Sequence, residues 1–166
     1  RLLGADYGAV LLPEPDGGYS WHGVHGARAA VWRPVPPPRE GGCGPAYDAL
    51  TTGRTVVYGP GQPRGTAELR ASPGHRREGG RVALATPLIS RDETLGALML
   101  GWRRDVEVLP QQAQLAEALA GYAATVLDDA HVRAEVRAQA EALRRLAAEW
   151  TAVIEQMPSG LVVVDA

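Results

Sequence analysis

The C-terminal part of the chain, from Gln111 to Met157, has the residue spacing of a single long helix. Pro110 stands at its start, where proline is common, and the sequence Pro158-Ser159-Gly160 follows its end. At a rise of 1.5 Å per residue, a helix of about 45 residues extends roughly 70 Å, which is more than the width of a small domain. The sequence therefore predicts a folded domain followed by a connecting helix.

This helix carries an apolar repeat of seven residues beyond its first turns. Imperfect repeats of this kind favour a parallel two-stranded coiled coil that can shift between packings, and Asp129 and Gln139 interrupt the repeat here. The alternative is a single helix that lies on its own domain. We expect a homodimer through the long helix, with the partner-facing residues Val132, Val136, Leu143, Leu146, Trp150 and Val153.

Composition limits the remaining choices. The 166 residues suffice for one domain and an appendage, and the formal net charge of −2 gives no general attraction to nucleic acid or to an anionic membrane. No apolar run approaches the roughly 20 residues that cross a bilayer, so no membrane contact is expected from this segment. The single cysteine, Cys43, allows no internal disulfide, which favours a cytoplasmic location. Lys, Asn and Phe, whose codons are AT-rich, are absent, which indicates a GC-rich bacterial genome.

Alternating apolar residues and turn-forming residues predict five strands and one short helix before the long helix. The strongest signal is the pair of strands joined by the turn from Ser90 to Thr94. Residues 59–80 have many Gly, Pro and Arg and no apolar periodicity, so a mobile loop or lid is expected there. In chain order the elements are strands at 7–12 and 19–25, a helix at 45–50, and strands at 55–58, 81–89 and 95–102.

The order of these elements resembles the GAF family of sensor domains. The best match is Ala83-Leu84-Ala85-Thr86-Pro87-Leu88-Ile89 followed by Leu95-Gly96-Ala97-Leu98-Met99-Leu100 and then a long helix. The resemblance implies an α+β fold with a GAF-like antiparallel sheet, helices on one face, and a long C-terminal coiled-coil helix. It covers residues 1–127, without the usual first helix; residues 128–157 then form a signalling helix. Residues 158–166 look like the first strand of a truncated PAS domain.

In this family a small ligand lies between the other face of the sheet and the segment that corresponds to residues 26–80. Aromatic side chains there could stack on a planar ligand, or they could be ordinary core. The pocket candidates are Trp21, His22, His25, Cys43, Tyr47, Tyr58 and Met99.

The sequence names no cofactor. Bilin-binding members usually have His after the attachment Cys, whereas Gly44 follows Cys43, so covalent bilin is disfavoured. His22 and His25 are an odd number of residues apart, so an ideal strand points them to opposite faces and no shared metal is expected. Either could ligate haem, which we disfavour. Five arginines between Arg64 and Arg81 could attract an anion or form a solvated loop.

No catalytic arrangement stands out, so this fragment is not expected to be an enzyme. The layout of sensor domain, helix and PAS-like strand is common in bacterial sensor histidine kinases, which predicts a small-molecule or redox sensing and dimerisation module with PAS and kinase domains downstream. The alternatives are the input domain of a serine phosphatase or a diguanylate cyclase, a ligand-free dimerisation scaffold, and a small redox enzyme that uses Cys43.

Overall fold

The computed structural model describes residues 3–28 and 44–156, with backbone alone for 152–156. The chain divides into two units, Arg1–Asp128 and Asp129–Ala166, and each is described by itself. The first unit contains one antiparallel sheet and the helices that cover it. The second unit consists, in its described part, of the continuation of one helix. Cys43 and the expected PAS-like strand of residues 158–166 lie outside the described residues.

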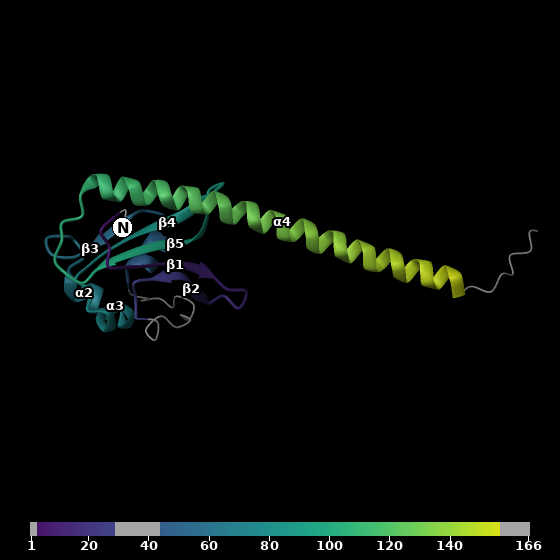
Figure 1. The fold of residues 1–166 in the computed structure, drawn as a ribbon, viewed down its shortest axis with the longest axis horizontal. Coiled ribbons are helices and arrows are strands. Elements are labelled where there is room, and N and C mark those ends of the chain that lie inside the picture. Colours follow the sequence, from purple (N-terminus) through teal and green to yellow (C-terminus); the bar gives the residue numbers. More distant parts are fainter. Residues whose placement is uncertain (1–2, 29–43, 157–166) are drawn as a thin grey trace, which may run out of the picture. The chain divides into compact units, whose positions relative to one another are not determined.

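Five strands form a single sheet in the order β2-β1-β5-β4-β3, and every neighbouring pair is antiparallel (Figure 1). This confirms the predicted α+β class with an antiparallel sheet, and the predicted strands agree with the observed ones to within two residues. The strands are β1 (Tyr7–Pro13), β2 (Tyr19–His25), β3 (Val56–Tyr58), β4 (Val82–Ser90) and β5 (Glu93–Trp102).

The hairpin between β4 and β5 turns at two residues. Arg91 and Asp92 both have positive φ, 49° and 67°, which is the conformation that a type I′ turn requires and that matches the twist of the flanking strands. The turn is fastened to the last helix because Arg91 and Ser90 both contact the carboxylate of Asp128, at 3.1 Å and 2.9 Å. The predicted hairpin is therefore confirmed, with a tighter turn than the sequence suggested.

One face of the sheet is covered by the first part of helix α4 (Pro110–Gln156). Three alanines one turn apart, Ala116, Ala120 and Ala124, lie on one side of the helix and are buried against the sheet. Strand residues such as Leu84 and Leu88 complete these two apolar clusters. This arrangement confirms the predicted packing of the start of the long helix on the sheet.

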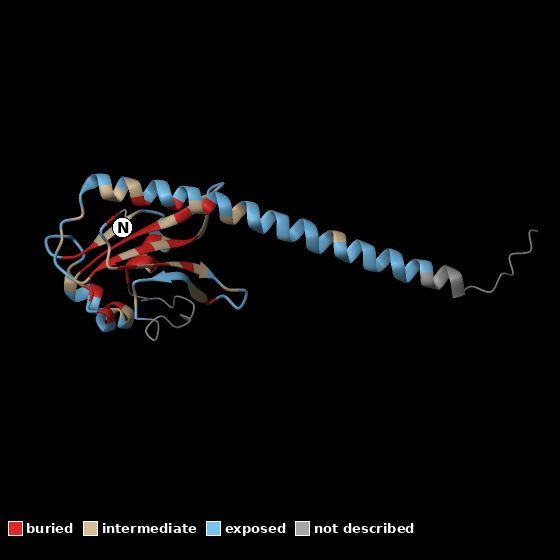
Figure 2. Cartoon of the chain, viewed as in Figure 1, coloured by how far each residue is buried: buried red, intermediate tan, exposed pale blue. Residues whose placement is uncertain are grey.

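The opposite face is covered by the short helix α1 (Pro45–Thr52). Pro45 stands at its first position, and Gly53 ends it with a φ of 63°, as the sequence predicted. In Figure 2 the buried residues lie on the strands and on the helix surfaces turned towards them, whereas α4 in the second unit is almost entirely exposed.

Close backbone approach explains two glycines of β5. A Cβ at Gly101 would lie 2.1 Å from the ring of Tyr7, and one at Gly96 would lie 2.4 Å from the carbonyl oxygen of Leu11. Both distances are far below contact, so only glycine fits at these positions.

Residues 59–80 are not the structureless loop that was expected. They contain two short helices, α2 (Thr66–Ala71) and α3 (Pro73–Glu78). Leu69 of α2 is fully buried against Tyr58 and Ala83, and this one leucine supplies the anchor that periodicity could not reveal in so short a helix. The prediction missed the proline at the start of α3 and Gly79 at its end, where φ is 70°.

Helix α4 has 47 residues and begins one residue before the predicted start. The backbone NH of Leu109 donates to the side chain of Gln112 at 2.9 Å, which caps its first turn. Within the part of the chain that the structure describes, none of the helices has both the length and the apolar character that a membrane span needs.

Candidate ligand site and its polar border

The sheet face beneath α1 is lined mainly by small side chains. Ala46 and Ala49 of α1 pack against Ala85, Ala97 and Met99 of the central strands, and all five are buried. Further residues at the margin close this cluster, namely Tyr7, Ala9, Leu11, Tyr19, Trp21, Ala27, Leu50 and Val56. The face is apolar, and at its centre alanines of α1 meet alanines of the strands.

Three of the seven pocket candidates gather on this face. Met99 is at the centre of the cluster, and Trp21, opposite Leu11 in the register of β1 and β2, packs against it. Tyr47 of α1 meets the ring of Tyr19 edge to face, with the ring centroids 6.0 Å apart. The structure thus brings the aromatic candidates of two distant segments together, and their role in binding a ligand stays a prediction.

Tyr58 lies at the edge of the same face, where it joins β3 to α1. Its hydroxyl donates to Asp48 at 2.6 Å, and Arg64 lies 3.3 Å from the same carboxylate oxygen. Burial, and after it the hydrogen bond to Asp48, raise the pKa of Tyr58 above its ordinary value. Tyr58 therefore remains a protonated donor that fastens the strand to the helix.

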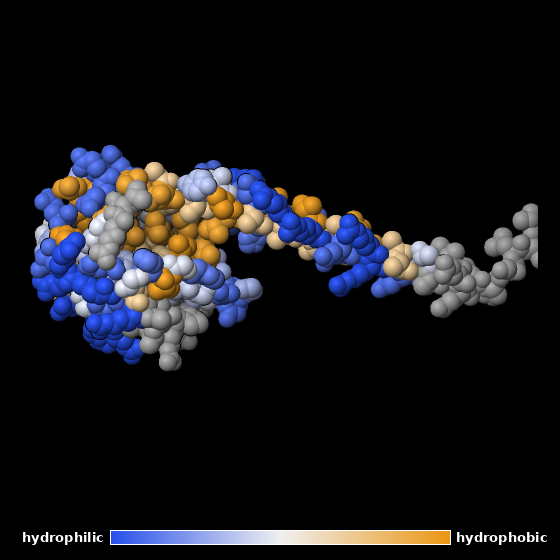
Figure 3. Space-filling view, in the orientation of Figure 1, coloured by the Kyte–Doolittle hydropathy of each residue, from blue (hydrophilic) through white to orange (hydrophobic). Residues whose placement is uncertain are grey.

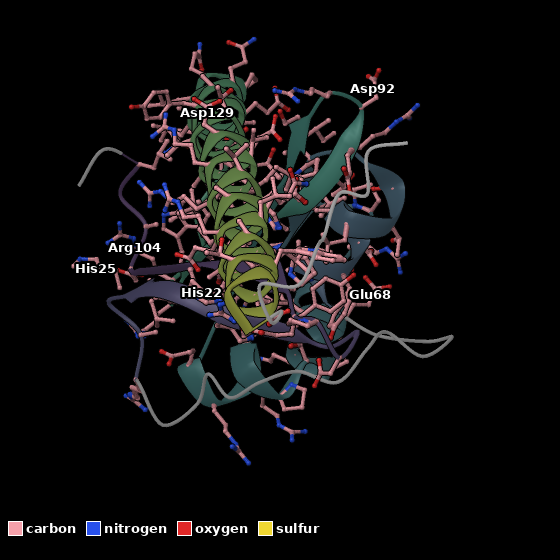
Figure 4. All side chains as sticks on the ribbon, turned by 90° about the vertical axis from the view of Figure 1, so that its right-hand side faces the viewer. His22, His25, Glu68, Asp92, Arg104 and Asp129 are labelled. Carbon is pink, nitrogen blue, oxygen red and sulfur yellow. The ribbon has the colours of Figure 1, made fainter. Side chains whose placement is uncertain are left out.

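His22 and His25 lie elsewhere, on the exposed edge strand β2 (Figure 4). A bulge pairs them with Val10 and Gly8, which are only two residues apart on β1, so the odd spacing does not place them on opposite faces. Val10 packs towards the α4 side of the sheet. The structure therefore separates both histidines from the cluster that contains Trp21 and Met99.

His22 belongs to a surface group that resembles a hydrolytic triad only in composition. Ser20 donates a short hydrogen bond to Glu14 and lies 2.6 Å from Nε2 of His22. In a triad the imidazole lies between hydroxyl and carboxylate, whereas here the hydroxyl takes the middle place and gives its proton to the carboxylate. This order does not activate Ser20 as a nucleophile.

The sequence reasoning missed a buried polar group at the other end of the face. The hydroxyl of Tyr7 and Nδ1 of His75 are joined by a hydrogen bond of 2.9 Å, and both residues are buried. Burial lowers the pKa of His75 to about 4, although the carboxylate of Glu78 acts in the opposite direction. Burial also raises the pKa of Tyr7, so both groups are neutral near pH 7.

Glu78 and Arg103 extend this group. The carboxylate of Glu78 is completely buried and lies 2.5 Å from the guanidinium of Arg103, which also lies over the ring of Tyr7 at 5.2 Å from its centroid. The sequence signal was weak because His75 and Glu78 fall in the segment that was taken for a mobile loop. Pro73 and Gly79 are typical start and stop residues of a helix and could have identified α3. His75 and Glu78, three residues apart, are the buried residues of this helix.

The arginine-rich segment does not form one cationic site. Arg64 pairs with Asp48, and Arg81 forms a two-pronged contact with Asp105. Arg70, Arg76 and Arg77 are exposed on α2 and α3. The arrangement fits a solvated surface better than an anion pocket.

An open groove of about 490 Å³ follows the edge of β4 beyond the end of β3. Arg54 and Glu117 on its walls are exposed, and its buried polar side chain, Thr86, already receives a hydrogen bond from Thr55 at 2.9 Å. Pro87 lacks an NH at this edge, which discourages the addition of another strand. The groove therefore has no buried unpaired group that would select a ligand.

In the described ranges, no three side chains of His, Cys, Asp or Glu come close enough to hold a metal ion. The face beneath α1 is a packed apolar cluster with aromatic margins, and the tyrosine hydroxyls at its edges are bonded to His75 and Asp48.

Comparisons with known proteins agree with this fold. Residues 1–127 match the family model of the GAF domain. A domain described as belonging to a two-component sensor histidine kinase of Sinorhizobium meliloti has 15% identity and a TM-score of 0.62, with 81% of this chain and 87% of that chain covered. A GAF domain/HD domain protein of Geobacter sulfurreducens has 16% identity and a TM-score of 0.58, with 79% and 85% covered.

A third structure is the NreA protein of Staphylococcus aureus, mutated in its nitrate binding site, with 27% identity, a TM-score of 0.51 and coverage of 66% and 82%. None of the curated proteins matches the chain. The family match spans most of the sequence, and the sheet order and covering helices agree with it. The chain therefore belongs to the GAF domain family.

Proposed function

We propose that this chain is the sensory and dimerisation module of a bacterial signal-transduction protein and that it acts in the cytoplasm. A small ligand at the sheet face beneath α1 would bias the packing of two α4 helices, and the helices would carry that bias to the next domain by a shift between two populated states. The GAF family and the apolar, aromatic-edged face support the sensing part of this proposal.

The observation that carries the dimerisation part is a row of large apolar side chains exposed along α4 in the second unit. Figure 3 shows apolar side chains among hydrophilic ones along this helix. Exposed residues of this size at heptad spacing are expected where a partner helix covers them. Their exposed fractions are 40% for Val132, 59% for Val136, 67% for Leu143, 51% for Leu146 and 66% for Trp150.

Light scattering tests this dimer. Replacing both Leu143 and Leu146 with Asp would bury charges in the seam, so the variant should be monomeric at concentrations where the unchanged chain is dimeric. A matched control replaces Ala134 and Ala148, which lie on the opposite side of the heptad, with Asp, and it should remain a dimer. A dimer that survives in the Leu143 and Leu146 variant would place the interface elsewhere.

Native mass spectrometry tests the sensing part. The purified protein should retain a small molecule, and Trp21→Ala should reduce the retained fraction because Trp21 borders the face beneath α1. Arg137→Ala is the control, since this exposed residue lies in the second unit and outside the apolar seam. Equal loss in both variants, or no retained mass in the unchanged protein, would contradict a ligand site at this face.

For the output we propose a sensor histidine kinase with a PAS domain after the helix. The serine phosphatase, diguanylate cyclase and ligand-free scaffold remain alternatives, and Cys43 as a redox group would be recognised by a Cys43→Ser variant that no longer responds to oxidant. The sequence Gly160-Leu161-Val162-Val163-Val164-Asp165 supports the PAS domain. Autophosphorylation of the parent protein with labelled ATP tests the kinase.

A further inference from the structure

Glu78, the last residue of α3, has a completely buried carboxylate with partners from two other segments. Its Oε1 accepts from the backbone NH of Arg28, 2.7 Å away, in the segment that follows β2. Its Oε2 accepts from the guanidinium of Arg103 at 2.5 Å. A buried carboxylate that loses its cation is strongly unfavourable, so α3 cannot move away from Arg103 without a large cost.

Arg103 occupies the position directly after β5, at the start of the segment that leads into α4. Its Nε donates to the carbonyl of Glu78 at 3.2 Å, and its Nη2 also donates to the carbonyl of Gly26 at 2.9 Å. Its backbone NH donates to the carboxylate of Asp6 at 2.8 Å. One arginine therefore ties the end of α3 and the exit of β2 to the backbone between β5 and α4.

A second ion pair links the same regions in a different environment. Arg81, just after α3, contacts Asp105 in the segment before α4, and both side chains are well exposed. Exposed pairs contribute little because water screens them. Comparing the buried Glu78–Arg103 pair with the exposed Arg81–Asp105 pair therefore tests how strongly each couples the end of α3 to the segment before α4.

We propose that the Glu78–Arg103 ion pair is the regulatory latch of this module: it couples the position of α3 to the backbone that enters α4. The latch rests on the proposed function, since it specifies how a change beside the ligand face reaches the output helix. The coupling is stiff because the carboxylate has no solvent to replace Arg103, whereas the exposed Arg81–Asp105 pair can separate into water. Arg103 acts as a positioning residue through Glu78 and Asp6.

Amide hydrogen exchange measured by NMR on the whole chain tests the latch. Glu78→Gln keeps the shape of the side chain and removes its charge, so the amide of Arg103 should exchange at least about tenfold faster. Arg103→Gln should accelerate the amide of Gly80, which donates to the carbonyl of His75, by a similar factor. The reciprocity follows because a coupling between two sites acts equally in both directions.

Two controls separate a latch from general loss of stability. Arg81→Gln removes the exposed pair, and Leu69→Ala creates a cavity under α2 without touching Arg103. Both should leave the Arg103 amide within about threefold of its original exchange rate. The latch is overturned if the Arg103 amide in Glu78→Gln exchanges within about threefold of its original rate. It is also overturned if Leu69→Ala accelerates that amide as much as Glu78→Gln does.

If Glu78→Gln does not fold, Arg103→Lys carries the test, because lysine keeps the charge but cannot reproduce the forked contacts. The amide of Gly80 should then exchange at least about tenfold faster, and a change within about threefold overturns the latch. Light scattering on the same samples keeps the two proposals apart. A monomeric unchanged chain would contradict the proposed dimer while the exchange pattern still decides the latch. A dimer without the exchange pattern would remove the latch alone.

Discussion

The two parts of helix α4 differ in the size and burial of their apolar side chains. In the first unit the helix buries alanines, Ala116, Ala120 and Ala124, in apolar clusters that larger strand residues complete. In the second unit it carries large apolar side chains such as Leu143 and Trp150, and these are exposed. The alanines face a sheet of the same chain, whereas we propose that a second chain covers the large exposed residues.

The largest expected effect on stability comes from disrupting the packing of α4 against the sheet. Ala120→Asp would place an unpaired charge against Leu88, and it should lower the free energy of unfolding by roughly 3–5 kcal/mol. Ala148→Asp, in the second unit, should cost only the difference in helix propensity, about 0.7 kcal/mol. Urea unfolding followed by tryptophan fluorescence measures both. Similar costs for the two changes would show that α4 does not depend on its packing with the sheet.

A pH dependence should arise in the first unit alone. The pKa of His75 is lowered to about 4 from an ordinary value near 6.5, so between these values the unfolded chain binds the proton that the folded chain refuses. Stability should therefore be complete above about pH 6.5 and fall as the pH drops towards 4, by roughly 2–4 kcal/mol in total.

Thermal unfolding at a series of pH values checks this expectation. His75→Gln should flatten the curve between pH 4 and 6.5, whereas His22→Gln, which changes an exposed histidine, should leave the slope unchanged. A slope that persists in His75→Gln would assign the acid sensitivity to the carboxylates instead.

Protein concentration should act on the second unit. If a second chain covers the exposed residues of α4, each tenfold dilution weakens the helix pair by about 1.4 kcal/mol, and helical content should fall on dilution. Circular dichroism at 222 nm from micromolar to nanomolar concentration measures this. In a Trp150→Leu variant, which keeps an apolar side chain in the seam, the remaining tryptophans all belong to the first unit, and their fluorescence should not change over the same range.

These regions also differ in how far the sequence foretold them. The strands, α1 with its Gly53 stop and the length of α4 followed from periodicity and turn residues, because each signal is local and repeated. The helices α2 and α3 did not, since six residues are too few for a period to show and the burial of Leu69 depends on Tyr58 and Ala83.

Of the seven pocket candidates, the structure gathers Trp21, Tyr47 and Met99 on one face, and their role in binding a ligand stays a prediction. The polar border was missed because Tyr7, His75, Glu78 and Arg103 are far apart in sequence, and their pairing follows from the sheet order. The position of His22 and His25 depended on one bulge, which period-two reasoning cannot locate.

The smallest expected effect concerns Gly121, on the part of α4 that belongs to the first unit. A Cβ at Gly121 would meet nothing within 4 Å, in contrast to Gly101, where it would lie 2.1 Å from the ring of Tyr7. Gly121→Ala should therefore raise the free energy of unfolding by about 0.5–1 kcal/mol, because alanine restricts the unfolded chain and favours the helix. Gly101→Ala should lower it, since backbone or ring must shift. Urea unfolding of both variants gives the signs, and a destabilising Gly121→Ala would contradict the expected gain from open space and helix propensity.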